Sequence, residues 1–192
     1  MKIIVTGFGQ FGKIVENPTT TLAQKLKGNA NATEVFVLEV SADGLNEALA
    51  PYWAEAEASD EPFIFLHMGV SHKGTAINLE QVGYNVADFR IPDMRGWEPA
   101  AEPIAPNGPE SYSTNLPVED LAAALGPHTN VSTDPGRYIC NYVYYKSLAV
   151  THAKANQHAL FVHVPEFTVV SEADQLATIE HLLVLLRATD EA

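Results

Sequence analysis

Residues 2–12 read KIIVTGFGQFG, a short apolar run that passes directly into a glycine-rich turn. Residues 2–6 of this stretch are rich in the β-branched side chains that favour strands. Three later runs have the same character and are separated by segments with helical patterns: residues 34–40 (EVFVLEV), 63–67 (FIFLH) and 160–164 (LFVHV). Strands that alternate with helices are typical of α/β proteins. The chain is therefore predicted to have an α/β fold.

Capping residues predict three helices that flank this sheet. Asn17 and Pro18 have the residue types preferred at the N-cap and first position of a helix, which would run to Leu26. Asp43 could cap a second helix that extends through residue 58, and Ser171 could cap a third. In the third helix, apolar residues recur at spacings of three and four, which indicates a packing face: Leu176, Ile179, Leu183 and Leu186.

Two segments between these elements lack a helical pattern. Residues 76–91 alternate enough to predict strands or a hairpin inserted at the edge of the sheet. Residues 92–117 are rich in proline, glycine, asparagine and serine, which predicts a surface loop. No linker or repeat divides the chain, so residues 1–192 are expected to form a single domain.

The composition excludes several classes of protein. The 11 basic and 24 acidic side chains give a net charge of −13, which opposes binding to nucleic acid or to an anionic membrane surface. No apolar run approaches the roughly 20 residues of a membrane span, and MKIIVTGFG at the start does not resemble a signal peptide. The single cysteine cannot form an internal disulfide. A cytoplasmic location is therefore predicted.

The glycine-rich turn offers a first interpretation of function. Gly7, Gly9 and Gly12 match the G-x-G-x-x-G pattern of dinucleotide-binding proteins, and Glu39 could imitate the acid that binds ribose. However, the predicted helix starts only at Asn17-Pro18, beyond the motif, and Glu39 lies 27 residues after Gly12 rather than about 20 after the fingerprint. This spacing favours a tight structural loop. A nucleotide-dependent enzyme is the alternative, and stabilisation by nucleotide would support it.

Cys140 follows a turn formed by residues 134–136 (DPG), and residues 140–155 then continue without proline or glycine. This pattern predicts a helix that begins at the cysteine. Unpaired N–H groups and the positive end of the helix dipole would favour a thiolate there. The alternative is a small buried hydrophobic residue.

A cysteine nucleophile needs a base and a group that orients the base. His163 lies in residues 161–165 (FVHVP), at the end of a strand, where ligands of α/β sheets bind. Glu80 interrupts the apolar stretch 77–81 (INLEQ), and Arg90 in residues 89–93 (FRIPD) could stabilise an oxyanion. The alternatives are a core histidine, an exposed edge carboxylate and an arginine paired with a nearby aspartate. The spacing of the other histidines does not predict a metal site.

Five segments in order resemble pyroglutamyl peptidase I, the pyrrolidone-carboxylate peptidase family of cysteine peptidases. They cover nearly the whole chain: residues 6–12 (TGFGQFG) with Asn17-Pro18, 79–85 (LEQVGYN), 90–93 (RIPD), 136–141 (GRYICN) and 161–165 (FVHVP). The resemblance implies a three-layer α/β/α sandwich with a twisted mixed sheet of the phosphorylase/hydrolase-like type. It further implies removal of N-terminal pyroglutamate from peptides through a thioester acyl-enzyme, without a cofactor.

The resemblance also implies the roles of the catalytic residues. Cys140 would be the nucleophile, His163 the general base and then acid, and Glu80 the group that orients the imidazole. Arg90 matches a residue near the reacting carbonyl. Some relatives are tetramers, so a homo-oligomer is one expectation. A module that recognises pyroglutamyl termini without cleaving them is the alternative function.

A second set of residues matches the family's substrate pocket. Phe8 and Phe11 correspond to aromatic walls around the pyrrolidone ring, and Asn17 to a residue that braces the pocket. Backbone groups near Val70 and Ile139 would satisfy the polar edge of the lactam. The chain departs from the family at Val70, where many bacterial members have glutamine, and at Pro135, where alanine is frequent. These departures bear on fine specificity rather than on the chemistry.

Overall fold

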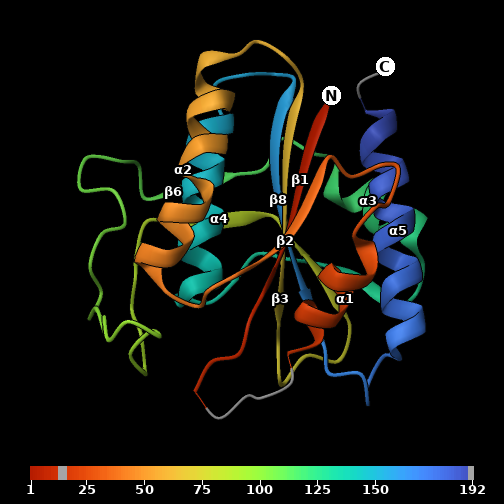
Figure 1. Ribbon diagram of the computed structural model, residues 1–192, viewed down its shortest axis with the longest axis horizontal. Coiled ribbons are helices and arrows are strands. Elements are labelled where there is room, and N and C mark those ends of the chain that lie inside the picture. Colours follow the sequence, from red (N-terminus) through yellow and green to blue (C-terminus); the bar gives the residue numbers. More distant parts are fainter. Residues whose placement is uncertain (13–16, 190–192) are drawn as a thin grey trace.

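The computed structural model describes residues 1–12 and 17–189, in which a mixed sheet of six strands forms the centre of the protein (Figure 1). The strand order is β2-β1-β3-β8-β4-β7. The strands have these bounds: β1 (Lys2–Phe8), β2 (Glu34–Leu38), β3 (Phe63–Val70), β4 (Ile77–Glu80), β7 (Thr129–Ser132) and β8 (Gln157–Val164). Strand β4 runs antiparallel to β8, and the other neighbouring strands are parallel.

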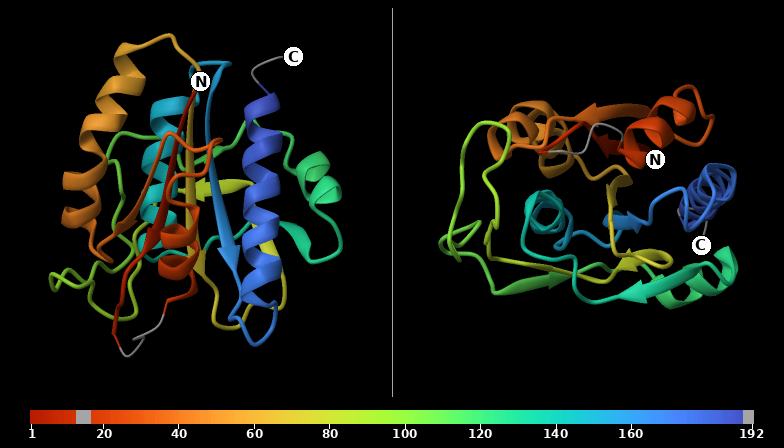
Figure 2. Two further views of the ribbon diagram at one scale, coloured as in Figure 1. Left: turned by 45° about the vertical axis from the view of Figure 1, so that its right-hand side comes forward. Right: turned by 90° about the horizontal axis from the view of Figure 1, so that it is seen from below.

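Helices cover both faces of this sheet, so the protein has three layers (Figures 1 and 2). One face carries α2 (Ala42–Ala58) and α4 (Ile139–Thr151). The opposite face carries α1 (Pro18–Leu26), α3 (Val118–Leu125) and α5 (Glu172–Ala188). This arrangement confirms the predicted three-layer α/β/α sandwich with a mixed sheet.

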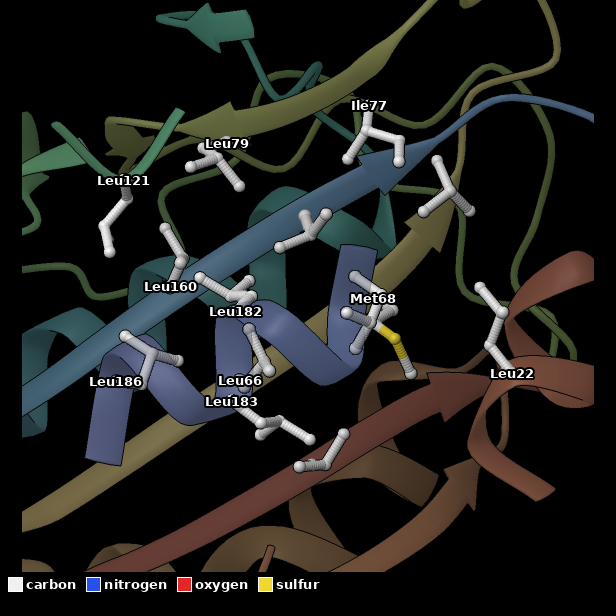
Figure 3. Packing of buried hydrophobic residues seen from close by; sticks show 14 of the residues in the cluster. Leu22, Leu66, Met68, Ile77, Leu79, Leu121, Leu160, Leu182, Leu183 and Leu186 are labelled. Carbon is white, nitrogen blue, oxygen red and sulfur yellow. The ribbon is translucent and has the colours of Figure 1, made fainter. Parts of the chain in front are cut away.

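Two apolar cores lie between these layers, and the alternation of side chains along each strand separates them. In β3, Leu66 and Met68 belong to the core under α1 and α5, together with Leu160 of β8 and Leu183 of α5 (Figure 3). Phe65 of β3 belongs to the opposite core, with residues of α2 and α4. Neighbouring residues of a strand therefore point to opposite faces of the sheet and belong to different cores.

Two of the three predicted capping residues mark a helix start correctly. The Asn17 side chain accepts a hydrogen bond from the backbone of Thr19 and caps α1, and Ser171 caps α5. The prediction for Asp43 was wrong, because the side chain of Ser41 caps α2 by accepting a hydrogen bond from Gly44, which leaves Asp43 in the first turn. Helix α4 begins at Ile139, one residue before the predicted start at Cys140, and it ends at Thr151.

The prediction for residues 76–91 was partly wrong. The segment forms strands, but β4 lies inside the sheet between β8 and β7 instead of at its edge. Strand β5 (Val82–Tyr84) leaves the sheet and pairs with β6 (Ser111–Ser113), which lies within the predicted surface loop 92–117. Helix α3 and strand β7 were not predicted. Within the described residues, no helix combines the length and apolar character needed to cross a membrane.

Candidate active site

Strands β4 and β8 place Glu80 and His163 on the same face of the sheet. Leu79 and Val162 point into the core under α1 and α5, so the adjacent Glu80 and His163 point towards α4. The two side chains meet there, with 2.7 Å between His163 Nδ1 and Glu80 Oε1. The pair is enclosed, because the side chain of Glu80 is 1 % exposed and that of His163 is 11 % exposed. The alternative of an exposed edge carboxylate is therefore wrong.

The environment of His163 favours its charged form. Burial lowers the pKa of the imidazole, but hydrogen bonds to Cys140 and Glu80 outweigh this effect and raise the pKa to about 9. An imidazolium that contacts both a thiol sulfur and a carboxylate can stabilise a thiolate. It can also hold a proton ready for transfer.

Cys140 occupies the second position of α4. The helix begins after Tyr138, its N-cap, whose side chain makes no capping hydrogen bond. The turn before the helix has Gly136 at φ +74°, and Asp134 Oδ1 accepts a hydrogen bond from the Gly136 N–H at 3.1 Å. The first N–H groups of a helix lack intrahelical partners, so the sulfur lies beside donors that could hold a developing negative charge.

Gly69 of β3 provides the space that the thiol occupies. It pairs with His163 in the register of β3 and β8. A Cβ atom at position 69 would lie 2.8 Å from Cys140 Sγ and 2.7 Å from Cζ of Phe161. Since Phe161 is fully buried, a side chain here would displace either the core ring or the sulfur. The position of the thiol therefore depends on a glycine in the neighbouring strand.

A narrow slot opens beside the sulfur. Its lining includes Cys140 and the five residues that were predicted to bind substrate: Phe8, Phe11, Asn17, Val70 and Ile139. Val40 and Tyr138 also line the slot and were not predicted. Their positions, two residues beyond the end of β2 and at the N-cap of α4, give only a weak signal in the sequence.

Contacts between β1 and α1 fix the aromatic wall of the slot. A Cβ atom on Gly7 would lie 2.2 Å from the carbonyl oxygen of Thr19, so this glycine allows the strand to pack directly on the helix. The Phe8 N–H donates to Thr19 Oγ1 at 3.0 Å, and Asn17 Nδ2 donates to the carbonyl oxygen of Gly9 at 3.0 Å. These contacts favour the structural interpretation of the glycine pattern, because α1 begins beyond it at Pro18.

Arg90 lies outside the slot. It lines an adjoining hollow of about 600 Å³ that shares Phe11 and Tyr138 with the slot. The alternative of an arginine paired with Asp93 or Asp88 is not observed among residues 1–12 and 17–189. The Asp93 carboxylate accepts hydrogen bonds from backbone N–H groups, including that of Ala42 at 2.9 Å, and Asp88 Oδ1 accepts one from Ala101. The structure therefore places Arg90 in the hollow beside the slot and not in the lining of the slot that contains Cys140.

A second buried histidine supports the elements around the site. His67 Nδ1 lies 2.7 Å from Thr6 Oγ1, and its Nε2 lies 2.9 Å from Ser147 Oγ. Trp53 Nε1 donates to the same Ser147 oxygen at 3.0 Å. Burial lowers the pKa of His67 to about 3, so this ring stays neutral. The network joins β1, β3, α2 and α4.

The fold and the site together define a class: an α/β/α protein with cysteine, histidine and carboxylate side chains beside a narrow slot. The chain belongs to the pyroglutamyl peptidase family, whose model matches residues 1–180. The pyrrolidone-carboxylate peptidase of Pyrococcus furiosus is 36 % identical over 172 residues, which cover 86 % of this chain and 81 % of the relative. That of Levilactobacillus brevis is 33 % identical over 172 residues, with coverage of 86 % and 82 %.

Solved structures of related proteins have the same architecture. The pyrrolidone carboxyl peptidase of Pyrococcus furiosus superposes with a TM-score of 0.87 at 29 % identity and covers 99 % of both chains. The pyrrolidone carboxyl peptidase of Fervidobacterium islandicum has a TM-score of 0.83 at 28 % identity, with 99 % of each chain covered. The likeness therefore extends over the three layers and the strand ends that carry the site.

Proposed function

We propose that this protein is a cysteine peptidase that removes the N-terminal pyroglutamyl residue from peptides. The observation that carries the proposal is the buried pair of His163 Nδ1 and Glu80 Oε1, 2.7 Å apart, with the imidazole also bonded to Cys140 at the slot. In this proposal Cys140 is the nucleophile, His163 exchanges protons, and Glu80 fixes the orientation and tautomer of the imidazole. Family membership supports the same activity.

The slot suits a pyroglutamyl ring, which is flat and neutral and has one N–H donor and one C=O acceptor. The rings of Phe8 and Phe11 would cover its apolar faces. Backbone groups near Val70 and Ile139 would bond to its polar edge, and a missing hydrogen bond in this site would cost about 1–3 kcal/mol. Proline lacks the ring carbonyl and would be rejected for that reason. Ordinary N-terminal residues carry a charged amine that the apolar slot does not neutralise.

The proposed reaction has two steps. The Cys140 thiolate attacks the pyroglutamyl carbonyl carbon, and N–H groups at the start of α4 hold the oxyanion. The C–N bond then breaks as His163 gives its proton to the leaving amine, which produces a thioester. In the second step, His163 takes a proton from water, the hydroxide adds to the thioester, and the C–S bond breaks. Pyroglutamate leaves and the thiolate is restored.

Arg90 enters this scheme only as a candidate. Help with the oxyanion, the role implied by the resemblance, would require its guanidinium to reach from the adjoining hollow to the slot.

The proposed chemistry also needs a reduced thiol, because oxidation of Cys140 would remove the nucleophile. A reducing compartment such as the cytoplasm is the proposed location.

A fluorogenic pyroglutamyl amide tests the proposal. The protein should release the fluorophore in the presence of a reductant, and iodoacetamide should abolish the activity. Cys140→Ala should be inactive but folded, whereas Lys27→Gln, at the exposed end of α1, should keep full activity. Full activity of Cys140→Ala would refute the scheme. Binding of the amide without turnover by the unmodified protein would instead support the recognition module, and stabilisation by a nucleotide would support the nucleotide alternative.

A further inference from the structure

The hollow beside the slot is lined by two acidic and two basic side chains. Asp88, Arg90, Asp134 and Arg137 line it, together with Phe11 and Tyr138, which also line the slot. The slot is lined by the residues proposed to enclose the first ring, whereas the hollow beside it has a volume of about 600 Å³, which is the size of a ligand pocket. The hollow therefore has room for a substrate residue beyond the first ring.

The slot and this hollow share a wall that is formed by Phe11 and Tyr138. Phe11 and Tyr138 are both partly exposed, and their ring centroids lie 6.1 Å apart. Among the described residues, a second hollow of about 550 Å³ shares one lining residue with the slot, Asn17, which is buried and bonded to Gly9 and Thr19. The residue that follows pyroglutamate would therefore leave past Phe11 and Tyr138.

Most charges in the hollow already have partners. Arg137 Nη1 lies 2.7 Å from Asp134 Oδ1, and the guanidinium stacks at 4.0 Å over the ring of Tyr84. Asp88 Oδ1 accepts a hydrogen bond from the backbone of Ala101 at 3.3 Å. Within residues 1–12 and 17–189, Arg90 makes no hydrogen bond or ion pair. Arg90 is therefore a cation at the hollow that is free to bind an incoming anion.

We propose that this hollow binds the residue directly after pyroglutamate, and that Arg90 recognises a carboxylate on that residue. The proposal rests on the proposed function, because it assigns the part of the peptide that leaves. The net charge of −13 opposes acidic peptides at long range, but at physiological ionic strength the field is screened within about 8 Å. A direct contact with Arg90 acts inside that distance. Exposed ion pairs of this kind change binding by roughly two- to fivefold.

Three matched substrates test this assignment: pyroglutamyl-glutamate amide, pyroglutamyl-glutamine amide and pyroglutamyl-lysine amide. The Glu and Gln substrates have the same shape and differ in charge, and the C-terminal amide removes the second carboxylate. The measured quantity is the ratio of kcat/KM for the Glu substrate to that for the Gln substrate. Arg90→Gln should lower this ratio by roughly two- to fivefold, and Arg90→Lys should restore most of it.

Two control variants separate local from general charge effects. Lys27→Gln removes one positive charge far from the hollow and should leave the ratio unchanged. Asp88→Asn removes a negative charge that lines the same hollow, so it should raise the Glu/Gln ratio and lower kcat/KM for the Lys substrate.

The outcomes distinguish this proposal from the proposed function. Cleavage of none of the three substrates by the unmodified protein would refute the proposed function and the subsite with it. If all three are cleaved and Arg90→Gln lowers kcat/KM equally for each, the subsite assignment is wrong and Arg90 acts on the reacting carbonyl. An unchanged ratio without any loss of rate would also overturn the subsite while leaving the peptidase assignment intact.

Discussion

Replacement of Gly69 by alanine should misplace the nucleophile. The added Cβ atom would lie 2.8 Å from Cys140 Sγ, about 0.6 Å closer than ordinary van der Waals contact begins. The neighbouring ring of Phe161 is fully buried, so the sulfur has more freedom to move than the ring. Displacement of a reacting group by about 1 Å costs on the order of 100-fold in rate. We therefore expect kcat to fall roughly 10- to 100-fold while KM changes little.

The same substitution should also overpack the core, at a cost of roughly 1–3 kcal/mol. For a chain of this size, such a loss lowers Tm by a few degrees to about ten degrees, so the variant remains folded at 25 °C. Steady-state kinetics with a fluorogenic pyroglutamyl amide would measure the effect. The rate of Cys140 alkylation by iodoacetamide at neutral pH should fall in parallel, because the sulfur would lose its hydrogen bond to His163.

Gly9→Ala is the matched control. Its Cβ atom would meet the Leu38 carbonyl oxygen at 3.5 Å, which is ordinary contact, so kcat should stay within about twofold of the unmodified value. Wild-type kcat and alkylation rate in Gly69→Ala would refute the reasoning, because they would show that the sulfur does not depend on the space above this glycine.

Three further perturbations have defined outcomes. Glu80→Gln should lower kcat far more than it changes KM. It should also move the alkaline limb of the pH–rate profile below pH 9, because the carboxylate helps to raise the pKa of His163 to about 9. An unchanged alkaline limb would argue against that coupling. Burial lowers the pKa of His67 to about 3. The contribution of the neutral ring to the free energy of unfolding is therefore present above pH 6.5 and is lost as the pH falls towards 3, by up to several kcal/mol. In denaturant unfolding, the free energy of unfolding of His67→Gln should decrease less with falling pH than that of the unmodified protein. Phe11→Ala should raise KM, with a loss of binding free energy of a few kcal/mol at most. The Tm should change little, because Phe11, unlike Phe8, is partly exposed. Unchanged kinetics would show that Phe11 is not part of the binding site.

Local chemistry made much of the fold predictable. Asn17-Pro18 and Ser171 mark helix starts because a cap depends on hydrogen bonds within one turn. Asp43 failed as a predicted cap because Ser41, two residues earlier, has a side chain that can do the same, and the sequence does not decide between them.

Pairing between distant segments explains what the sequence did not predict. The position of β4 inside the sheet depends on its antiparallel contact with β8 and its parallel contact with β7. Strand β7 is a short polar segment, TNVS, that becomes a strand only through that partner. The contribution of Tyr138 to the slot depends in the same way on Phe11, which lies far away in the chain.

The predicted site residues followed a clearer rule. Cys140 lies at the start of α4 and His163 near the carboxyl end of β8, where functional side chains of α/β proteins collect. Glu80 ends the antiparallel strand β4 and meets His163 through the pairing of β4 with β8. The geometry brings these three together. Arg90 has no such constraint, since it lies in an exposed segment after the strands, and its role stays a prediction.

The central claim is that Cys140 carries the pyroglutamyl group during turnover. Mass spectrometry of a reaction with a pyroglutamyl ester, quenched in acid within the first turnovers, tests this claim directly. A pyroglutamyl adduct should appear on the peptide that contains Cys140, and hydroxylamine should remove it, as expected for a thioester. Rapid turnover with no adduct at Cys140, or with the adduct on another residue, would contradict the account.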